Sequence, residues 1–429
     1  MRTLGARIRS LVAPLSDDSI RRLWFARVIS EGGDWAARLA LGLLVFGETH
    51  SALATTAVTA VSLLPHLGIG QVLGTLADRF PHRTVMVVSE LWRGTVYLLL
   101  AFVHLPVPSV LALAFVAGLA DPPFQAACGA ALPQLAGERY ITVLTLWTST
   151  RQAMTLVGFA AGGLLVAATS PSVALALNAL SFFLGVPFIA RSRPTRSADP
   201  DDERQPLMRA AVRALTSDRL IVVSAATVTV GAVLGMTVES LMVAYAAHLG
   251  YGARGAGLLA TIPPIAALLT ALLIRAEGEH ARLVRRVCWM VGAASTIAFA
   301  AFVVDVPMPF IVIAFLAAGT TDVMTVPAAA VIGERLPQAS RGTAFSFLEG
   351  ALGVAQVVGA LTAGALATVM SVAHASAILA LPALAMGIVG LIVVPSRDRA
   401  TGADGIRKET TGFSGLLVPA SPAERPDWL

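Results

Sequence analysis

The sequence predicts an all-α membrane protein in which twelve transmembrane helices form two pseudo-symmetric bundles of six. Two observations on composition favour this class: 56% of the 429 residues are hydrophobic and only 13% are charged, about half the charged share of soluble domains. A third observation is that apolar stretches long enough to cross a hydrocarbon core of about 30 Å recur along the chain.

The apolar stretches divide into an N-terminal and a C-terminal set. We predict helices at residues 22–47, 53–76, 84–104, 108–131, 142–167 and 173–190, and at 220–246, 254–274, 285–304, 309–331, 343–368 and 374–394. The domain boundaries follow from these stretches: an N-terminal segment over 1–21, a first bundle over 22–190, a cytoplasmic linker over 191–219, a second bundle over 220–394 and a tail over 395–429. The linker and the tail are polar and contain proline, which is typical of segments without a packed core, and we expect the tail to be disordered.

The placement of basic residues predicts the orientation. Most of the 31 Lys and Arg residues lie in the N-terminal segment, the linker, the tail and the loops on the same side, whereas the opposite loops contain Arg254 alone. Basic residues concentrate on the cytoplasmic side of membrane proteins. We therefore expect a multi-pass plasma-membrane protein with both termini in the cytoplasm, and the formal charge of +5 does not indicate nucleic-acid binding.

An internal repeat links the two sets of helices. Residues 117–121 read Ala-Gly-Leu-Ala-Asp and residues 318–322 read Ala-Gly-Thr-Thr-Asp, and a Leu-Pro-Gln triplet follows each of them, at 132–134 and 336–338. The two signatures are 201 and 204 residues apart. This spacing indicates a duplicated bundle, although alanine and glycine are abundant enough here for chance to remain the alternative.

Four charged residues lie inside the first apolar stretch. Arg27, Glu31, Asp34 and Arg38 follow a spacing of four, three and four residues, which places them on one face of a helix within an arc of about 60°. A charge at the centre of a bilayer costs on the order of 2.5 to 3.5 kcal/mol on insertion scales. Such a stripe therefore requires a wet or paired interior, and it is the first candidate for function.

The loop between the second and third helices resembles the signature loop of the major facilitator superfamily. Residues 74–83 read Gly-Thr-Leu-Ala-Asp-Arg-Phe-Pro-His-Arg. The positions that match the family pattern are Gly74, Asp78, Arg79 and Arg83. Pro81 stands where the family has a glycine. The resemblance implies twelve helices in two bundles, with this loop joining the halves on the cytoplasmic side.

Three more stretches extend the resemblance, two of them to the drug-efflux and siderophore-export branch of that family. Glu90 and Arg93 look like the acid-x-x-Arg step of its third helix, and Gly33-Asp34 resembles the Gly-Asp of its first helix. Residues 158–163, Gly-Phe-Ala-Ala-Gly-Gly, resemble the antiporter motif, with Phe159 in place of proline. The small residues Gly158, Gly162 and Gly163 are expected to let helices pack closely.

The resemblance implies that the first, fourth, seventh and tenth helices line a central cavity. Asp34, Asp121 and Asp322 lie near the middle of three of these helices, and Glu31 is a neighbour of Asp34. Carboxylates near the midplane are what a proton-coupled carrier needs, because burial and like charges raise their affinity for protons. These four residues are the candidates for proton coupling or substrate contact, and structural ion pairs are the alternative.

Other charges are candidates for gating or for ion pairs. Arg38 and Glu239 are separated by the repeat offset of 201 and lie toward the outer ends of their helices, so we expect them to pair across the cavity, while Arg27 is assigned to the same class. Arg151 and Glu349 are expected to be buried on the fifth and eleventh helices. Arg151 is a candidate to hold a substrate anion, and structural pairing is the alternative for both.

Several functional classes lack sequence support. The chain has no phosphate-binding Gly-x-x-x-x-Gly-Lys-Ser/Thr loop and no Gly-x-Ser-x-Gly nucleophile motif, and its seven histidines show no metal-ligand spacing. Cys128 and Cys288 lie in separate apolar helices. We therefore expect no enzyme activity, no metal site and no cofactor.

The sequence thus predicts a secondary transporter that exports a small amphipathic molecule, such as a drug, an antibiotic or a secondary metabolite, in exchange for protons. Its expected partners are this substrate, protons and the lipid bilayer, without nucleic acid, and it is expected to act as a monomer in a bacterial membrane. An importer, or an exporter dedicated to one metabolite or siderophore, remains an alternative. A membrane scaffold or sensor that keeps the fold without transport is the alternative from another class.

Overall fold

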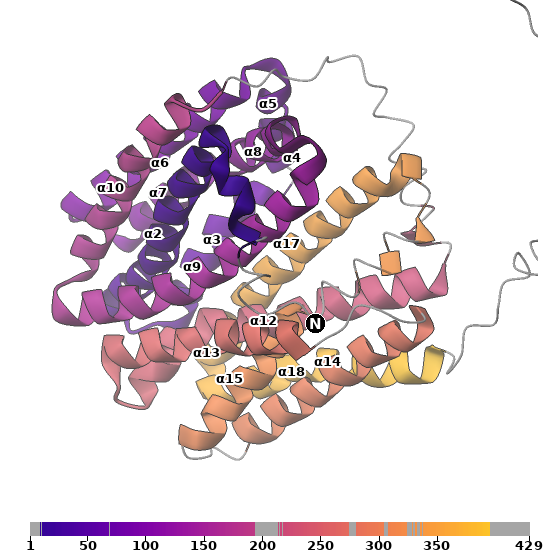
Figure 1. Ribbon diagram of the computed structural model, residues 1–429. Helices are drawn as coiled ribbons and strands as arrows, with labels where there is room; N and C mark the ends of the chain where they lie inside the picture. Colours follow the sequence, from indigo (N-terminus) through magenta and orange to yellow (C-terminus); the bar gives the residue numbers. More distant parts are fainter. Residues whose placement is uncertain are drawn as a thin grey trace, which may run out of the picture.

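The computed structural model describes residues 11–67, 69–193, 218–273, 280–303, 308–323 and 338–394, with a few single positions between these ranges. Most of the predicted linker and the predicted tail from residue 395 lie outside the described residues. The elements of the described part are helices (Figure 1). This confirms the predicted all-α class.

The helices follow the predicted apolar stretches in order. The first bundle contains α2 (Asp18–Thr49), α3 (Ala52–Leu63), η2 (Leu64–His66), α4 (Ile69–Gly74), α5 (Leu76–Arg79), α6 (His82–Phe102), α7 (Val107–Gly118), α8 (Asp121–Ala136), α9 (Tyr140–Ala168) and α10 (Pro171–Ala190), with short 3-10 turns at Ala13–Ser16 and Gly137–Arg139. The second bundle contains α12 (Arg219–His248), α13 (Gly252–Leu273), α14 (His280–Val303), α15 (Met308–Val323), α17 (Gln338–Val369) and α18 (Val372–Val393). Two predicted spans are interrupted. The second span is divided into α3, η2 and α4, and the fourth span is divided into α7 and α8.

Nine helical stretches in the described residues are long and apolar enough to cross a membrane. The first span, α2, is not among them because its charged stripe lowers its hydropathy, and the apolar stretches at Ala52–His66 and Ile311–Thr321 are shorter. A multi-pass membrane protein is therefore confirmed. The count of twelve spans stays a prediction.

Side-chain caps fix where several spans begin. Asp17 accepts hydrogen bonds from the backbone N–H groups of Ser19 at 2.8 Å and Ile20 at 3.2 Å, at the start of α2. Burial raises the pKa of Asp17, but these hydrogen bonds and the Arg193 guanidinium outweigh burial and bring it below its ordinary value. Ser51, Ser170 and Ser371 cap α3, α10 and α18 in the same way, because a short hydroxyl side chain satisfies N–H groups left open at a helix start.

The two bundles meet along two helix pairs, α9 with α13 and α3 with α17. A Cβ atom added to Gly163 would overlap the backbone of Gly257, and one added to Gly364 would overlap Thr56 and lie 2.9 Å from Leu53 Cα. Gly364 lies 201 residues after Gly163, and Gly257 lies 201 residues after Thr56. The two contacts are thus equivalent under the repeat offset, as a pseudo-two-fold axis between duplicated bundles requires.

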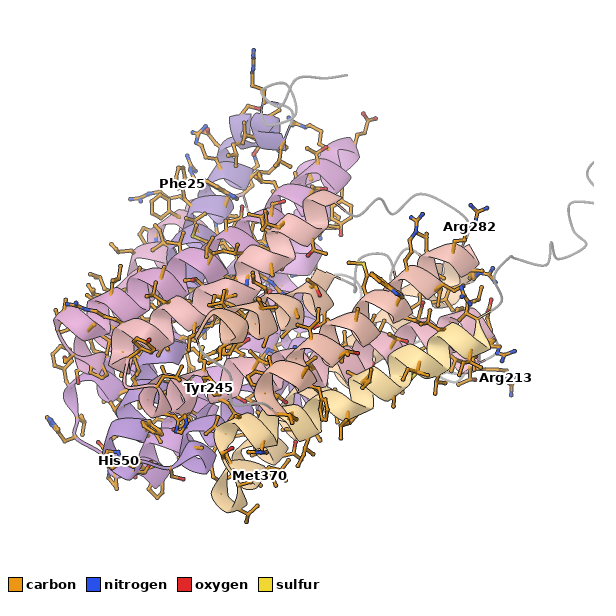
Figure 2. The ribbon with its side chains drawn as sticks, turned by 90° about the horizontal axis from the view of Figure 1, so that it is seen from below. Phe25, His50, Arg213, Tyr245, Arg282 and Met370 are labelled. Carbon is orange, nitrogen blue, oxygen red and sulfur yellow. The ribbon has the colours of Figure 1, made fainter. Side chains whose placement is uncertain are left out.

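Both contacts lie toward the same ends of the helices. We call the ends near residues 49–52, 168–171, 248–252 and 369–372 the outer ends, following the predicted topology, and the opposite ends the inner ends. In Figure 2, Phe25 on α2 and Arg282 on α14 lie near the inner ends of two separate arms, whereas Tyr245, near the outer end of α12, lies where the arms meet. The bundles are therefore joined at their outer ends and diverge at their inner ends.

Candidate functional site

A cavity of about 110 Å³ is formed by helices of the first bundle. Its lining comes from α2, α3, η2, α6, α7 and α8. The ionisable residues of the lining are Arg27, Glu31, Asp34, Arg38, His66, Arg93, Tyr97 and Asp121. The three arginines and the three carboxylates cancel in formal charge when all are ionised. The cavity therefore contains the whole charged stripe of α2 and charges from two further spans.

The inner part of the stripe forms an ion pair within α2. Arg27 Nη2 lies 3.0 Å from Glu31 Oε2, and the two side chains are only 5% and 16% exposed. The Arg27 guanidinium also lies 4.8 Å from the ring centroid of Trp147 on α9. The ion pair and the contact with the aromatic ring stabilise two charges, each of which would be costly to remove from water alone.

Asp34 and Asp121 both contact Arg93. The Arg93 Nη2 atom on α6 makes a close ion pair with Asp34 Oδ2 on α2, and its Nη1 atom lies 3.7 Å from Asp121 Oδ1 on α8. Asn178 on α10 donates to Asp34 Oδ1 at 3.5 Å, and the guanidinium lies 4.3 Å from the Phe182 ring centroid. One guanidinium, with its fork of N–H donors, therefore joins three spans at the cavity.

Glu90 is the most deeply buried acid near the site. Its residue is 0% exposed, and neither carboxylate oxygen has a hydrogen-bond partner among the described residues. A Cβ atom at Gly185 on α10 would lie 3.1 Å from Glu90 Oε2. Although the sequence pairs Glu90 with Arg93 as one motif, Arg93 forms its ion pairs with Asp34 and Asp121.

His66 is a site residue that the sequence reasoning missed. Its Nε2 atom lies 2.7 Å from Asp121 Oδ2, and Gln125 Nε2 donates to the other oxygen, Asp121 Oδ1, at 3.3 Å. His66 is an ionisable side chain within the predicted span 53–76. Such a residue inside a membrane span by itself indicates a functional site. The spacing of the histidines does not reveal it, because His66 has no metal-ligand partner at a regular spacing.

The predicted pair of Arg38 and Glu239 is present. Arg38 Nη1 on α2 lies 3.2 Å from Glu239 Oε1 on α12, and the guanidinium also lies 4.5 Å from the Trp35 ring centroid. This ion pair connects the two bundles at the outer side of the cavity. Its role in gating stays a prediction.

Arg151 differs from its prediction. The sequence places it as a buried charge on the fifth helix, but the residue is exposed in the inner half of α9. Trp147 and Gly158, four residues before it and seven after it, lie on the same helical face and contact α2, so the helical face alone does not determine its burial.

Three predicted site residues are not settled by the structure. The side chains of Asp78, Asp322 and Glu349 lie outside the described residues. Their predicted roles stay predictions.

The signature loop spans the end of the second span and the start of the third. Gly74 ends α4, Asp78 and Arg79 lie in α5, and Arg83 lies in the first turn of α6. Arg83 Nη1 donates to the carbonyl oxygen of Ala190 at 3.5 Å, which ties the loop to the inner end of α10. A Cβ atom on Gly74 would meet Ala126 Cβ at 3.7 Å, an ordinary contact, so close helix approach does not require a glycine there.

The motif glycines of α9 do allow close packing. A Cβ atom on Gly158 would lie 2.6 Å from Gly32 O and from Trp35 Cβ, and one on Gly162 would lie 2.7 Å from Ala36 Cα. Both distances are far below van der Waals contact. Gly158 and Gly162 therefore set the approach of α9 to α2, while Gly163 sets its approach to α13.

Sequence comparison gives a family and one relative. The model of the Major Facilitator Superfamily matches residues 23–278 and 227–423. The uncharacterized MFS-type transporter YfiS of Bacillus subtilis (strain 168) is 30% identical over 161 residues, which cover 37% of this chain and 38% of that protein. The alignment thus spans less than half of either protein.

Solved structures of transporters share the fold. The nucleoside transporter NupG superposes with a TM-score of 0.71 at 14% identity over 88% of this chain and 99% of that chain. A POT family transporter in complex with 5-aminolevulinic acid gives 0.70 at 11% identity, over 88% and 96%. A bacterial homolog of the human lysosomal transporter Spinster, inward-facing and unoccupied, gives 0.62 at 12% identity, over 88% and 95%.

Proposed function

Because this chain belongs to the Major Facilitator Superfamily of membrane transporters, we propose that it exports a small amphipathic molecule in exchange for protons. The transport cycle alternates access to the cavity by rocking the two bundles. The proposal places the protein in a bacterial plasma membrane, as a monomer with both termini in the cytoplasm.

The Arg93 guanidinium shared between Asp34 and Asp121 carries the proposal. A proton that neutralises Asp34 removes one of the two partners of Arg93, and the balance of charge between α2, α6 and α8 changes. Proton binding is thereby linked to the packing of three spans around the cavity. Glu31 and Asp322 are the further acids proposed for the same coupling.

The arrangement of the bundles supports alternating access. With the termini in the cytoplasm, the contacts of Gly163 and Gly364 and the ion pair between Arg38 and Glu239 close the outer side. The inner ends diverge (Figure 2). This conformation is then the one that accepts substrate from the cytoplasm, which an exporter needs.

The lining of the cavity supports an amphipathic substrate. Arginines and carboxylates lie beside the apolar side chains of Leu41, Ala114 and Phe124. A pocket with charges of both signs and an apolar wall suits a small molecule that has a polar and an apolar part. The transporters of the same fold named above are described with nucleoside and 5-aminolevulinic acid, and for this chain a small-molecule substrate is part of the proposal.

Two alternatives remain for the experiment to separate. An importer would use the same cavity in the opposite direction. A scaffold is favoured by the pairing of all four stripe charges, but a scaffold has no need for the cavity that these charges line. The cavity therefore favours transport.

Proton movement in proteoliposomes tests the proposal. Small amphipathic compounds, beginning with the fluorescent cation ethidium, are added on one side while a pH indicator reports the other. We expect substrate-driven proton movement opposite to the substrate for the intact protein, and its loss for Asp34→Asn. Glu48→Gln is the matched control, because Glu48 is an exposed acid at the end of the same helix.

The outcomes separate the alternatives. Proton movement in the same direction as the substrate would indicate an importer. No transport of any compound by well-folded protein would favour the scaffold, and unchanged proton movement in Asp34→Asn would remove Asp34 from the coupling role.

A further inference from the structure

His66 lies where two spans of the first bundle are interrupted at the same level. In the second span α3 ends at Leu63 and η2 runs to His66, and in the fourth span α7 ends at Gly118 and α8 begins at Asp121. The hydrogen bond between His66 and Asp121 connects the two interruptions. An ionisable pair therefore sits at a point where neither span is a continuous helix.

The two interruptions also pack against each other. A Cβ atom on Gly118 would lie 2.9 Å from Ser62 O, and one on Gly70 would lie 2.7 Å from Pro65 O and 3.2 Å from Pro122 Cγ. This tight contact leaves little room for one break to move without the other. A change in the interaction between His66 and Asp121 therefore acts on both spans together.

The two nitrogens of the imidazole have different contacts in this conformation. Nε2 lies 2.7 Å from a carboxylate oxygen of Asp121, which accepts, so Nε2 carries a hydrogen. Gln125 and Arg93 also face this carboxylate, which suits its ionised form. Nδ1 is buried and has no hydrogen-bond partner among the described residues. A second proton on Nδ1 would create a buried N–H that has no acceptor among the described residues, which costs about 1–3 kcal/mol.

The charged surroundings of His66 come from few elements. Asp121 on α8 contacts it directly, and Arg93 on α6 and Asp34 on α2 follow through Asp121. The packed elements α3, α4 and α7 contain no charged residue within their bounds. On α17 the charged residues are Arg341 and Glu349, whose side chains lie outside the described residues.

His66 also lies at the boundary between the bundles. The neighbouring Leu67 meets α17, where a Cβ atom on Gly353 would lie 3.2 Å from Leu67 Cδ2, and η2 itself contacts α17. Movement of the second bundle against the first must change this contact. The surroundings of Nδ1 therefore differ between the two conformations of a rocking cycle.

We propose that His66 is a proton-binding site of the transport cycle, which takes up a proton on Nδ1 in the conformation opposite to this one and releases it here. The proposal rests on the proposed proton-coupled transport. Water on the outer side supplies the proton. The imidazolium that forms neutralises the charge of the Asp121 carboxylate, and Arg93 then has Asp34 as its remaining charged partner. In the present conformation Nδ1 returns the proton to water on the inner side, and the pair regains one negative charge.

The ordinary titration range of histidine suits this task. An imidazole changes its charge between about pH 5 and 8, which covers the pH on both sides of a bacterial membrane. Since Nδ1 has no acceptor in the described part of this conformation, this conformation binds a second proton more weakly than one that gives Nδ1 a partner, and acidification should shift the population away from it by linkage. The inner ends should then approach each other.

Spin-label distances between the bundles test this without a substrate. Labels are placed on Thr84→Cys and Arg286→Cys, exposed positions near the inner ends of α6 and α14, in the full chain in lipid nanodiscs. The two native cysteines are buried. Between pH 8 and pH 5 we expect the distance distribution to shift to shorter values, with no shift in His66→Gln, which keeps an N–H donor toward Asp121 but does not titrate.

The controls decide between His66 and a general effect of pH. His104→Gln, at an exposed histidine, should shift as the unsubstituted protein does, and His66→Asn should behave as His66→Gln if the latter folds poorly. A full shift in His66→Gln, or no shift in the unsubstituted protein, would overturn the proposal. A shift that depends on His66, in a protein that exports no compound in proteoliposomes, would contradict the proposed export but support the proton site.

Discussion

At the residue scale, the main feature is that the charges of α2 are neutralised by different partners. Arg27 pairs with Glu31 on its own helix, Asp34 with Arg93 on α6 and Arg38 with Glu239 on α12. An unpaired charge in a membrane span costs on the order of 2.5 to 3.5 kcal/mol. Pairing therefore explains how four charges remain in one span, and the choice of partner couples α2 to its neighbours.

The same substitution at Glu31 and at Glu90 should have different effects on stability. Glu31→Gln removes the partner of buried Arg27 and should lower the free energy of unfolding by about 3 kcal/mol. Glu90→Gln removes a carboxylate that has no hydrogen-bond partner in the described residues, so it should cost less than about 1 kcal/mol or stabilise the protein. Thermal unfolding in detergent compares the two variants at pH 7, and equal losses would contradict this account of Glu90.

At the element scale, glycines determine how closely helices pack. Gly158 and Gly162 bring α9 onto α2, and Gly163 brings α9 onto α13. Small residues serve this purpose in membranes because dispersion contacts, rather than the hydrophobic effect, hold spans together there. The sequence identified these three positions through their spacing, while the helices that they contact became known only from the structure.

Two glycine-to-alanine substitutions should separate packing from helix propensity. Gly158→Ala places a methyl group 2.6 Å from Gly32 O and should destabilise the protein by about 1–3 kcal/mol. Gly129→Ala on α8 meets nothing within 4 Å and should be neutral or stabilise by up to about 1 kcal/mol, because alanine favours a helix over glycine. Unfolding midpoints of the two variants are the measurement, and a tolerated Gly158→Ala would argue against tight packing of α9 on α2.

At the scale of the whole molecule, the two bundles share a pattern of contacts but only a part of their charged positions. Gly118 packs on the backbone of Ser62, and Gly319 packs on the backbone of Pro263, again at the offset of 201. At this offset the counterparts of Arg27, Asp34, Glu90 and Arg93 are Val228, Gly235, Val291 and Ala294. The second bundle therefore repeats the scaffold without these charges, which places the buried ion network in the first bundle.

The ion pair between the bundles predicts the outcome of a charge exchange. Arg38→Glu and Glu239→Arg each bring like charges together and should impair ethidium transport in proteoliposomes. The double variant restores opposite charges at 3.2 Å spacing and should recover transport. A folded double variant that stays as impaired as the single variants would count against Arg38 and Glu239 acting as a pair.

Much of this architecture could be predicted from local sequence. Apolar length predicted the order of the spans, small residues predicted close packing on α9, and the repeat offset predicted that Arg38 and Glu239 meet. These features depend on composition, helical period or symmetry. The exposure of Arg151 could not be predicted in this way, because it depends on how far the neighbouring helices cover this part of α9.

The sequence by itself determined the class, the family and the charged face of α2, because hydropathy and periodicity are properties of single segments. Only the tertiary structure decided that Arg93 joins Asp34 to Asp121 and that His66 completes the group. Those contacts bring together residues 28, 55 and 59 positions apart, on spans whose mutual rotation no local pattern specifies. The partners of a buried charge are determined by helix packing, and at this site packing brings Asp34, Arg93, Asp121 and His66 into contact.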